Sequence, residues 1–194
     1  MSSKEKKSRI WILSGPSGSG KTTLCEGLLK DPFLKKRLIK SVSCTTRPAR
    51  KGEVKGKDYC HVSREEFLKL LKKRAFLEHE EIFGFFYGTP KTVVEEARKR
   101  SKDLLLCIDV KGARTVRRYF GKRALSIFIA PPDLKVLVKR LKGRSTESKK
   151  DIEKRLKRVK IELSFAREYD YIVVNDDLKV ALKKIKSIIL SESM

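Results

Sequence analysis

An eight-residue segment near the N-terminus constrains this chain more than any other feature. Residues 15–22 read Gly-Pro-Ser-Gly-Ser-Gly-Lys-Thr, the complete G-x-x-x-x-G-K-T pattern of a phosphate-binding loop. Its glycines permit a tight turn in which successive backbone N–H groups point at phosphate oxygens. Lys21 can reach the β- and γ-phosphates of a nucleoside triphosphate, and the Thr22 hydroxyl can bind Mg²⁺.

The residues on either side of this loop support the same interpretation. Residues 10–13 predict a short buried strand, and residues 22–29 predict a helix whose N-terminus adds partial positive charge beneath the phosphates. Strand, loop and helix stand in the order that this motif requires, which disfavours an ordinary glycine-rich turn. The residues expected to bind ATP here are Gly15, Pro16, Ser17, Gly18, Ser19, Gly20, Lys21, Thr22 and Thr23.

Composition limits the class of protein. The 194 residues are 40% hydrophobic and 37% charged, which predicts one folded domain with inserted lobes rather than a disordered chain. No apolar run is long enough to span a membrane, and the polar residues 1–9 do not resemble a signal peptide. The four cysteines form no C-x-x-C pair, so we expect a reducing, cytoplasmic location and no structural zinc.

The charge of the chain is unusual. It has 48 Lys and Arg against 24 Asp and Glu, giving a net charge of +24. Such a field attracts polyanions nonspecifically and in a salt-dependent way. Because the basic residues are spread along the whole chain, we interpret them as a compositional bias. Specific nucleic-acid binding is therefore kept only as an alternative role.

Strand and helix patterns alternate, which predicts an α/β domain with a mostly parallel sheet flanked by helices. Apolar runs predict strands at residues 10–13, 38–43, 103–110, 125–130 and 171–174. Periodic apolar residues predict helices at residues 22–29, 63–71, 92–100, 133–141, 152–165 and 178–190. Ser63 and Glu66 have the spacing of a capping box, and the polar stretch 144–150 predicts a mobile segment.

A second candidate site lies in residues 42–59, which read V-S-C-T-T-R-P-A-R-K-G-E-V-K-G-K-D-Y. Arg47 and Arg50 are close together there, and arginine forks suit phosphate oxygens. Taken alone, two arginines in a basic protein are more simply interpreted as solvated surface residues.

Several motifs together resemble the guanylate kinase family. They are G-P-S-G-S-G-K-T, the segment 42–59, F-L-E followed after eight residues by Y-G-T-P, I-D-V-K-G-A, R-L-K-G-R-S-T-E-S with Arg155 after it, and Y-D-Y-I-V-V-N-D-D-L. The resemblance covers roughly residues 9–190. It implies a P-loop kinase of purine nucleotide metabolism that converts ATP and GMP (or dGMP) to ADP and GDP with Mg²⁺, as a monomer or homodimer.

The resemblance also implies three lobes. Residues 1–42, 91–138 and 166–194 would form the core with the phosphate loop, residues 43–90 an inserted GMP-binding lobe, and residues 139–165 a mobile helical lid. Residues implied to bind GMP are Ser43, Arg47, Arg50, Tyr59, Glu78, Tyr87, Thr89 and Asp109. Within this set Glu78 and Thr89 read guanine, because a carboxylate accepts from the guanine N1–H and N2–H₂ edge and adenine offers no such donor pair.

Catalysis would depend on positioning and charge neutralisation rather than on a covalent nucleophile. The catalytic residues implied by the resemblance are Lys21, Arg47, Arg144 and Arg155, with Arg140 as a plausible addition. Asn175 matches a loop near the adenine and completes the expected ATP-binding set. Lid closure would also exclude water, which otherwise hydrolyses ATP.

The chain departs from the family pattern at Cys107, where the family usually has the first aspartate of Asp-Ile-Asp; Asp109 keeps the place of the second. A thiol accepts weaker hydrogen bonds than a carboxylate, so we expect weaker GMP binding without loss of chemistry. Lys111 replaces a common glutamine and Ser145 a usual glycine. Two alternatives stay open: a related P-loop kinase with another phosphorylated acceptor, and an inactive guanylate-kinase-like module that binds proteins.

Overall fold

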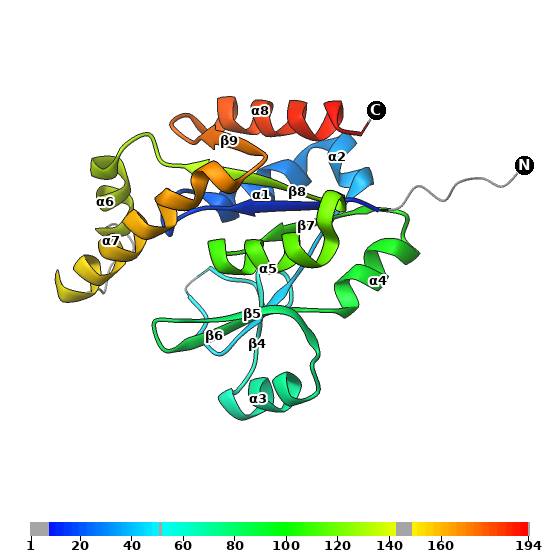
Figure 1. Cartoon of the computed structure of the whole chain (residues 1–194), viewed down its shortest axis with the longest axis horizontal. Coiled ribbons are helices and arrows are strands. Elements are labelled where there is room, and N and C mark those ends of the chain that lie inside the picture. Colours follow the sequence, from blue (N-terminus) through cyan, green and yellow to red (C-terminus); the bar gives the residue numbers. More distant parts are fainter. Residues whose placement is uncertain (1–7, 51, 143–148, 194) are drawn as a thin grey trace, which may run out of the picture.

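The computed structural model describes residues 8–50, 52–142 and 149–193 (Figure 1). Its larger sheet has the strand order β2-β7-β1-β8-β9, and every neighbouring pair is parallel. These strands are β1 (Ile10–Ser14), β2 (Leu38–Lys40), β7 (Asp103–Cys107), β8 (Ala124–Ala130) and β9 (Tyr171–Val174). The phosphate loop follows β1 in the middle of this sheet, so the carboxyl ends of β7 and β8 lie on either side of it.

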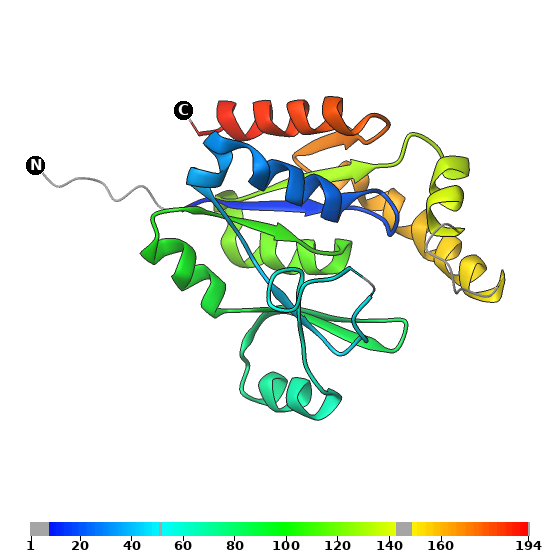
Figure 2. The same cartoon turned by 180° about the vertical axis from the view of Figure 1, so that it is seen from behind.

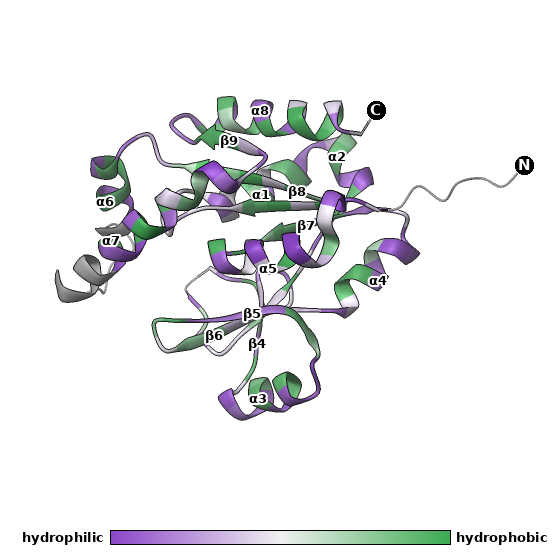
Figure 3. Cartoon of the chain, in the orientation of Figure 1, coloured by the Kyte–Doolittle hydropathy of each residue, from purple (hydrophilic) through white to green (hydrophobic). Residues whose placement is uncertain are grey.

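Helices cover both faces of the core sheet, which explains why its strands are continuous apolar runs (Figures 1 and 2). Trp11 and Leu13 of β1 pack against one helical layer, and Ile10 and Ile12 pack against the other. The first layer contains α1 (Lys21–Lys30), α2 (Pro32–Arg37) and α8 (Leu178–Ser191), and the second contains α4 (Thr92–Lys99) and α5 (Val110–Phe120). Figure 3 shows hydrophobic residues along these strands and, alternating with hydrophilic ones, on the helices that flank them.

A second, four-stranded sheet with the order β4-β3-β6-β5 is built entirely from the segment between β2 and α4. Its strands are β3 (Ser43–Thr45), β4 (Tyr59–His61), β5 (Phe76–Ile82) and β6 (Phe85–Pro90). The helix α3 (Arg64–Lys72) packs on it through Phe67, whose ring stacks 4.5 Å from Phe76 and 5.2 Å from Phe86. The predicted capping box at the start of α3 is confirmed, because Ser63 and Glu66 exchange both hydrogen bonds.

Two further helices, α6 (Leu134–Lys142) and α7 (Lys149–Ser164), pack together through Leu137 and Val159. Short 3₁₀ helices at Gly121–Arg123 and Phe165–Glu168 complete the described elements. Most of the stretch 144–150, which we predicted to be mobile, lies outside the described residues, although its last two residues begin α7. The boundaries of the three lobes stay a prediction.

Two predicted strands were too long. The strand predicted at 38–43 stops at Lys40, and Ser43 begins β3 in the other sheet. The strand predicted at 103–110 stops at Cys107, because Asp109 caps α5 by accepting a hydrogen bond from the Gly112 N–H at 2.8 Å. Sequence patterns did not predict the helices α2 and α5, nor the strands β4, β5 and β6 of the second sheet.

Candidate active site

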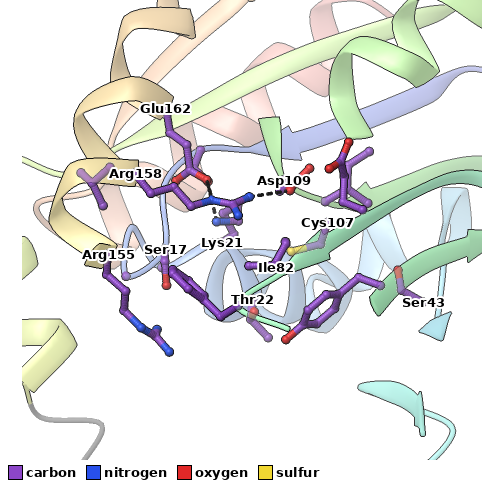
Figure 4. A pocket seen from close by; sticks show the side chains of 18 of the residues that line it. Ser17, Lys21, Thr22, Ser43, Ile82, Cys107, Asp109, Arg155, Arg158 and Glu162 are labelled. Atoms are coloured by element: carbon purple, nitrogen blue, oxygen red, sulfur yellow. Dashed lines mark hydrogen bonds and ion pairs between the residues drawn. The ribbon is translucent and has the colours of Figure 1, made fainter. Parts of the chain in front are cut away.

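A pocket opens where the carboxyl ends of β1 and β7 meet the second sheet and α7 (Figure 4). Residues of all these parts line it: Gly15, Ser17, Gly18, Gly20, Lys21, Thr22, Thr23, Ser43, Arg50, Tyr59, Glu78, Glu80, Ile82, Phe83, Tyr87, Cys107, Ile108, Asp109, Arg155, Arg158, Val159 and Glu162. The structure thus brings the predicted phosphate loop together with five predicted GMP-site residues from the second sheet and its loops.

The phosphate loop is held in its turn by contacts with the protein itself. The Lys21 ammonium donates to the carbonyls of Gly15 at 2.7 Å and Pro16 at 2.9 Å. Two glycines are required by close approach as well as by positive φ. A Cβ on Gly15 (φ +140°) would lie 2.4 Å from the Ile129 carbonyl oxygen, and a Cβ on Gly20 (φ +92°) would lie 2.2 Å from the Asn175 side-chain nitrogen.

Asn175, which we expected near the adenine, lies behind the phosphate loop and does not line the pocket. It is 5% exposed, and its Nδ2 donates to the Ser19 carbonyl at 2.8 Å. Both terminal nitrogens of Arg140 donate to the Asn175 carbonyl at 3.2 Å. In this arrangement Asn175 supports the loop, and Arg140 connects α6 to that support.

The second sheet places Glu78 and Thr89 side by side on β5 and β6. The Thr89 hydroxyl donates to Glu78 Oε1 at 2.5 Å, and the Ser43 hydroxyl lies 3.3 Å from that of Thr89. Burial raises the pKa of Glu78 to about 7, although the Thr89 hydrogen bond acts in the opposite direction. Thr89 itself is fully buried and contacts two residues that line the pocket, Glu78 and Ser43.

Arg47 is buried beside the pocket rather than on its wall. Its Nη2 lies 2.6 Å from Glu53 Oε1, and its Nη1 donates to the Pro48 carbonyl. The other oxygen of Glu53 accepts from the Arg50 N–H at 2.9 Å. Glu53, which was not among the predicted site residues, therefore holds the Arg47 side chain and the Arg50 backbone in place.

Cys107 ends β7 at the floor of the pocket. Its thiol interacts with the Cys25 thiol and with the Thr22 hydroxyl. The hydrogen bond from Cys25 and the positive charges of Lys21 and Lys40 lower the pKa of Cys107. The surroundings of this thiol, at the departure from the family pattern, thus favour its ionised form.

The helix α7 contributes more to the pocket than we predicted. Arg155, Arg158, Val159 and Glu162 all line it, at the i, i+3, i+4 and i+7 spacing of one helical face. Only Arg155 was predicted from the resemblance; the helical spacing within the predicted helix 152–165 was the signal that could have identified the others. Arg144, the other predicted lid arginine, lies outside the described residues.

The donor set next to the phosphate loop fits a magnesium ion bound largely by substrate. Thr22 lines the pocket at the start of α1 and offers a hydroxyl oxygen. Mg²⁺ commonly uses one or two protein oxygens together with phosphate oxygens and water. Within the described ranges, no group of three or more His, Cys, Asp or Glu side chains could hold a metal without such help.

Comparisons with known proteins identify the family of the chain. A model of the guanylate kinase family matches residues 7–192. Guanylate kinase from Anaplasma phagocytophilum is 43% identical over 185 residues, covering 95% of this chain and 87% of that protein. Guanylate kinase from Caldanaerobacter subterraneus is 41% identical over 188 residues, covering 97% and 89%. The crystal structure of the Anaplasma guanylate kinase superimposes with a TM-score of 0.80 at 38% identity, covering 96% of this chain and 87% of the other. The chain belongs to the guanylate kinase family.

Proposed function

We propose that this protein transfers the γ-phosphate of ATP to GMP, and less effectively to dGMP, giving ADP and GDP. The observation that carries the proposal is one pocket with a phosphate loop on one wall and a buried carboxylate, Glu78, on the other. The first wall suits the triphosphate of the donor, and the second suits the guanine of the acceptor.

On the acceptor side, Glu78 would accept hydrogen bonds from guanine N1–H and N2–H₂, with Thr89 fixing its orientation. Adenine would leave the buried carboxylate without donors, which costs binding free energy and gives specificity. The GMP phosphate would contact Ser43, Arg50, Tyr59 and Tyr87, all near one another in the pocket. Arg47 would act from behind, because Glu53 holds it beside Tyr59, with its guanidinium 5.5 Å from that ring.

On the donor side, the loop N–H groups and Lys21 would bind the ATP phosphates. Attack by a GMP phosphate oxygen needs alignment and neutralisation of charge on the transferring group. Arg155 lines the pocket and would supply one of these positive charges, and Arg144 would supply another. We expect Thr22 to hold Mg²⁺, which when bound neutralises phosphate charge. Thr23 would contact the ATP phosphates at the same end of α1.

We also propose a cytoplasmic protein that acts as a monomer or homodimer and has no specific role in binding nucleic acid. Among the described residues, every helix is too short or too polar to cross a membrane. The scattered free cysteines fit a reducing compartment.

The proposal is tested by coupled ADP-release assays with a panel of nucleoside monophosphates. We expect strong turnover with GMP, weaker turnover with dGMP, and little with AMP, CMP or UMP. Lys21→Ala should abolish turnover while the circular dichroism spectrum and melting temperature stay close to those of the parent protein. Absence of turnover with GMP, or equal turnover with AMP, would overturn the assignment, and a distinct preferred acceptor would favour a related kinase.

A further inference from the structure

Arg158 lies between two carboxylates at the inner end of the pocket (Figure 4). Its Nη2 is 2.9 Å from Asp109 Oδ2, and its Nε is 2.7 Å from Glu162 Oε1. The two contacts use two different nitrogens of one guanidinium, so Arg158 joins α7 to the loop between β7 and α5. This is a fork geometry that a lysine ammonium cannot reproduce.

Both carboxylates are fixed by their surroundings. Asp109 Oδ1 caps α5 through the Gly112 N–H, so its Oδ2 is the oxygen directed to Arg158. Glu162 is 7% exposed, and its second oxygen is buried without a hydrogen-bond partner among the described residues. Glu162 therefore depends on Arg158 for its charge compensation, because a buried carboxylate without a partner is costly.

The position of this cluster matters because the proposed function brings two anionic substrates into the same pocket. Without Arg158, Asp109 and Glu162 would each lose the cation that they contact, and both would present negative charge to the phosphates. Like charges a few ångströms apart repel strongly where the surroundings screen them less than bulk water does. One guanidinium neutralises much of this repulsion.

Arg158 also bears on where Arg155 lies. The two arginines are one turn apart on α7, and both guanidinium groups pack on Phe83, at 5.0 Å for Arg155 and 5.7 Å for Arg158. Phe83 is at the tip of the β5–β6 hairpin (φ +52°), so these contacts join α7 to the second sheet. Because Arg158 is anchored to Asp109 in the core, it fixes the face of α7 from which Arg155 projects.

We propose that Arg158 is a positioning residue for phosphoryl transfer in this protein, acting through Asp109, Glu162 and the face of α7 that carries Arg155. The role rests on the proposed function. It has two separable parts: charge compensation, which governs substrate binding, and the two-carboxylate fork, which governs the alignment of α7.

The test compares steady-state constants of Arg158→Ala and Arg158→Lys with those of the parent protein. Loss of the charge in Arg158→Ala should raise KM for both substrates several-fold and lower kcat by about tenfold or more. Arg158→Lys keeps a positive charge but loses the fork, so KM should return to within about twofold of the parent while kcat stays reduced. Lys160→Ala is the matched control, because Lys160 is an exposed cation on the same helix.

A double-mutant cycle with Glu162→Gln separates charge compensation from simple packing. If Arg158 acts through Glu162, then Arg158→Ala should cost less in kcat/KM when residue 162 is already neutral. Additive effects, or Arg158→Ala constants equal to those of Lys160→Ala, would overturn the inference. If Arg158→Ala does not fold, Arg158→Lys provides the test, and a kcat of that variant equal to that of the parent protein would also overturn the inference. Lack of GMP turnover by the parent protein would instead refute the proposed function.

Discussion

The side-chain amide of Asn175 donates a hydrogen bond to the carbonyl of Ser19, and thereby ties the residue after β9 to the middle of the phosphate loop. The two residues are 156 positions apart in the chain. The last strand of the core thus supports the loop that follows the first strand. Asn175 therefore stabilises the phosphate loop, and its expected position near the adenine stays a prediction.

This contact predicts the effect of replacing Asn175. Asn175→Ala should lower the free energy of unfolding by about 1 kcal/mol or more, because a buried hydrogen bond is lost. It should also raise KM for ATP several-fold while KM for GMP changes little, since the loop is the donor side of the pocket. Thermal unfolding and initial rates with each substrate varied provide the measurement. An effect on KM for GMP alone would contradict the assignment.

Burial of Glu78 predicts a pH dependence of GMP binding. With its pKa raised to about 7, Glu78 is increasingly protonated as pH falls below that value, and a protonated acid cannot accept both guanine donors. Between about pH 8 and about pH 6, KM for GMP should therefore rise by about tenfold. The phosphate of GMP ionises in the same range, so the matched control is Glu78→Gln. This variant should bind GMP more weakly, and its KM for GMP should change less with pH. Parallel profiles for the two proteins would exclude the mechanism.

The same raised pKa has a consequence for stability. The folded protein binds the Glu78 proton more tightly than the unfolded chain does, so the free energy of unfolding should fall as pH rises from the usual glutamate range through about 7. Glu78→Gln has no proton to lose, and its stability relative to the parent should increase over that interval. Urea unfolding at several pH values measures the difference.

Cys107 predicts a gain rather than a loss of function. Cys107→Asp should lower KM for GMP, because a carboxylate accepts stronger hydrogen bonds than the thiol that it replaces in the pocket. Cys107→Ser, which is similar in size but stays neutral, is the control and should not share this gain. A KM for GMP that is unchanged in Cys107→Asp would show that the missing carboxylate does not limit binding.

The Arg47–Glu53 pair predicts an indirect effect on the acceptor site. Glu53→Ala removes the carboxylate that holds Arg47 and the Arg50 backbone, so KM for GMP should rise by about tenfold and KM for ATP should not. The matched control is Glu65→Ala, since Glu65 is an exposed carboxylate of α3 paired only with Lys69 among the described contacts. Equal KM values for the two variants would mean that Glu53 does not position the loop.

The core of this fold could be predicted from the sequence because its signals are local. A glycine-rich loop after an apolar strand, and apolar runs such as Leu104–Leu106, need no distant partner to be recognised. The second sheet gave weak signals, because β3 and β4 are only three residues long and depend on pairing with β6. The strand β7 was extended too far because Ile108 and Val110 continue its apolar run past the Asp109 cap.

The residues of the candidate site also fall into two groups, those that sequence motifs identify and those that only the fold identifies. Residues such as Lys21, Glu78 and Tyr87 stand in motifs and were predicted, whereas Glu53 and Arg158 gain their importance only from partners brought together by folding. Sequence spacing cannot distinguish an arginine that lines the pocket from one that is buried beside it. Arg47 is buried beside the pocket.

The close packing around Gly15 and Gly20 has a consequence for the energetics of the reaction. Gly15 lies against the Ile129 carbonyl, and Gly20 lies against the Asn175 side chain. The protein itself therefore packs around the loop without a ligand. The loop is therefore preorganised, and ATP binding has little conformational entropy to remove from it. We therefore expect the free energy of the phosphate contacts to favour closure of the surrounding parts of the protein around the substrates, which would exclude the water that hydrolyses ATP.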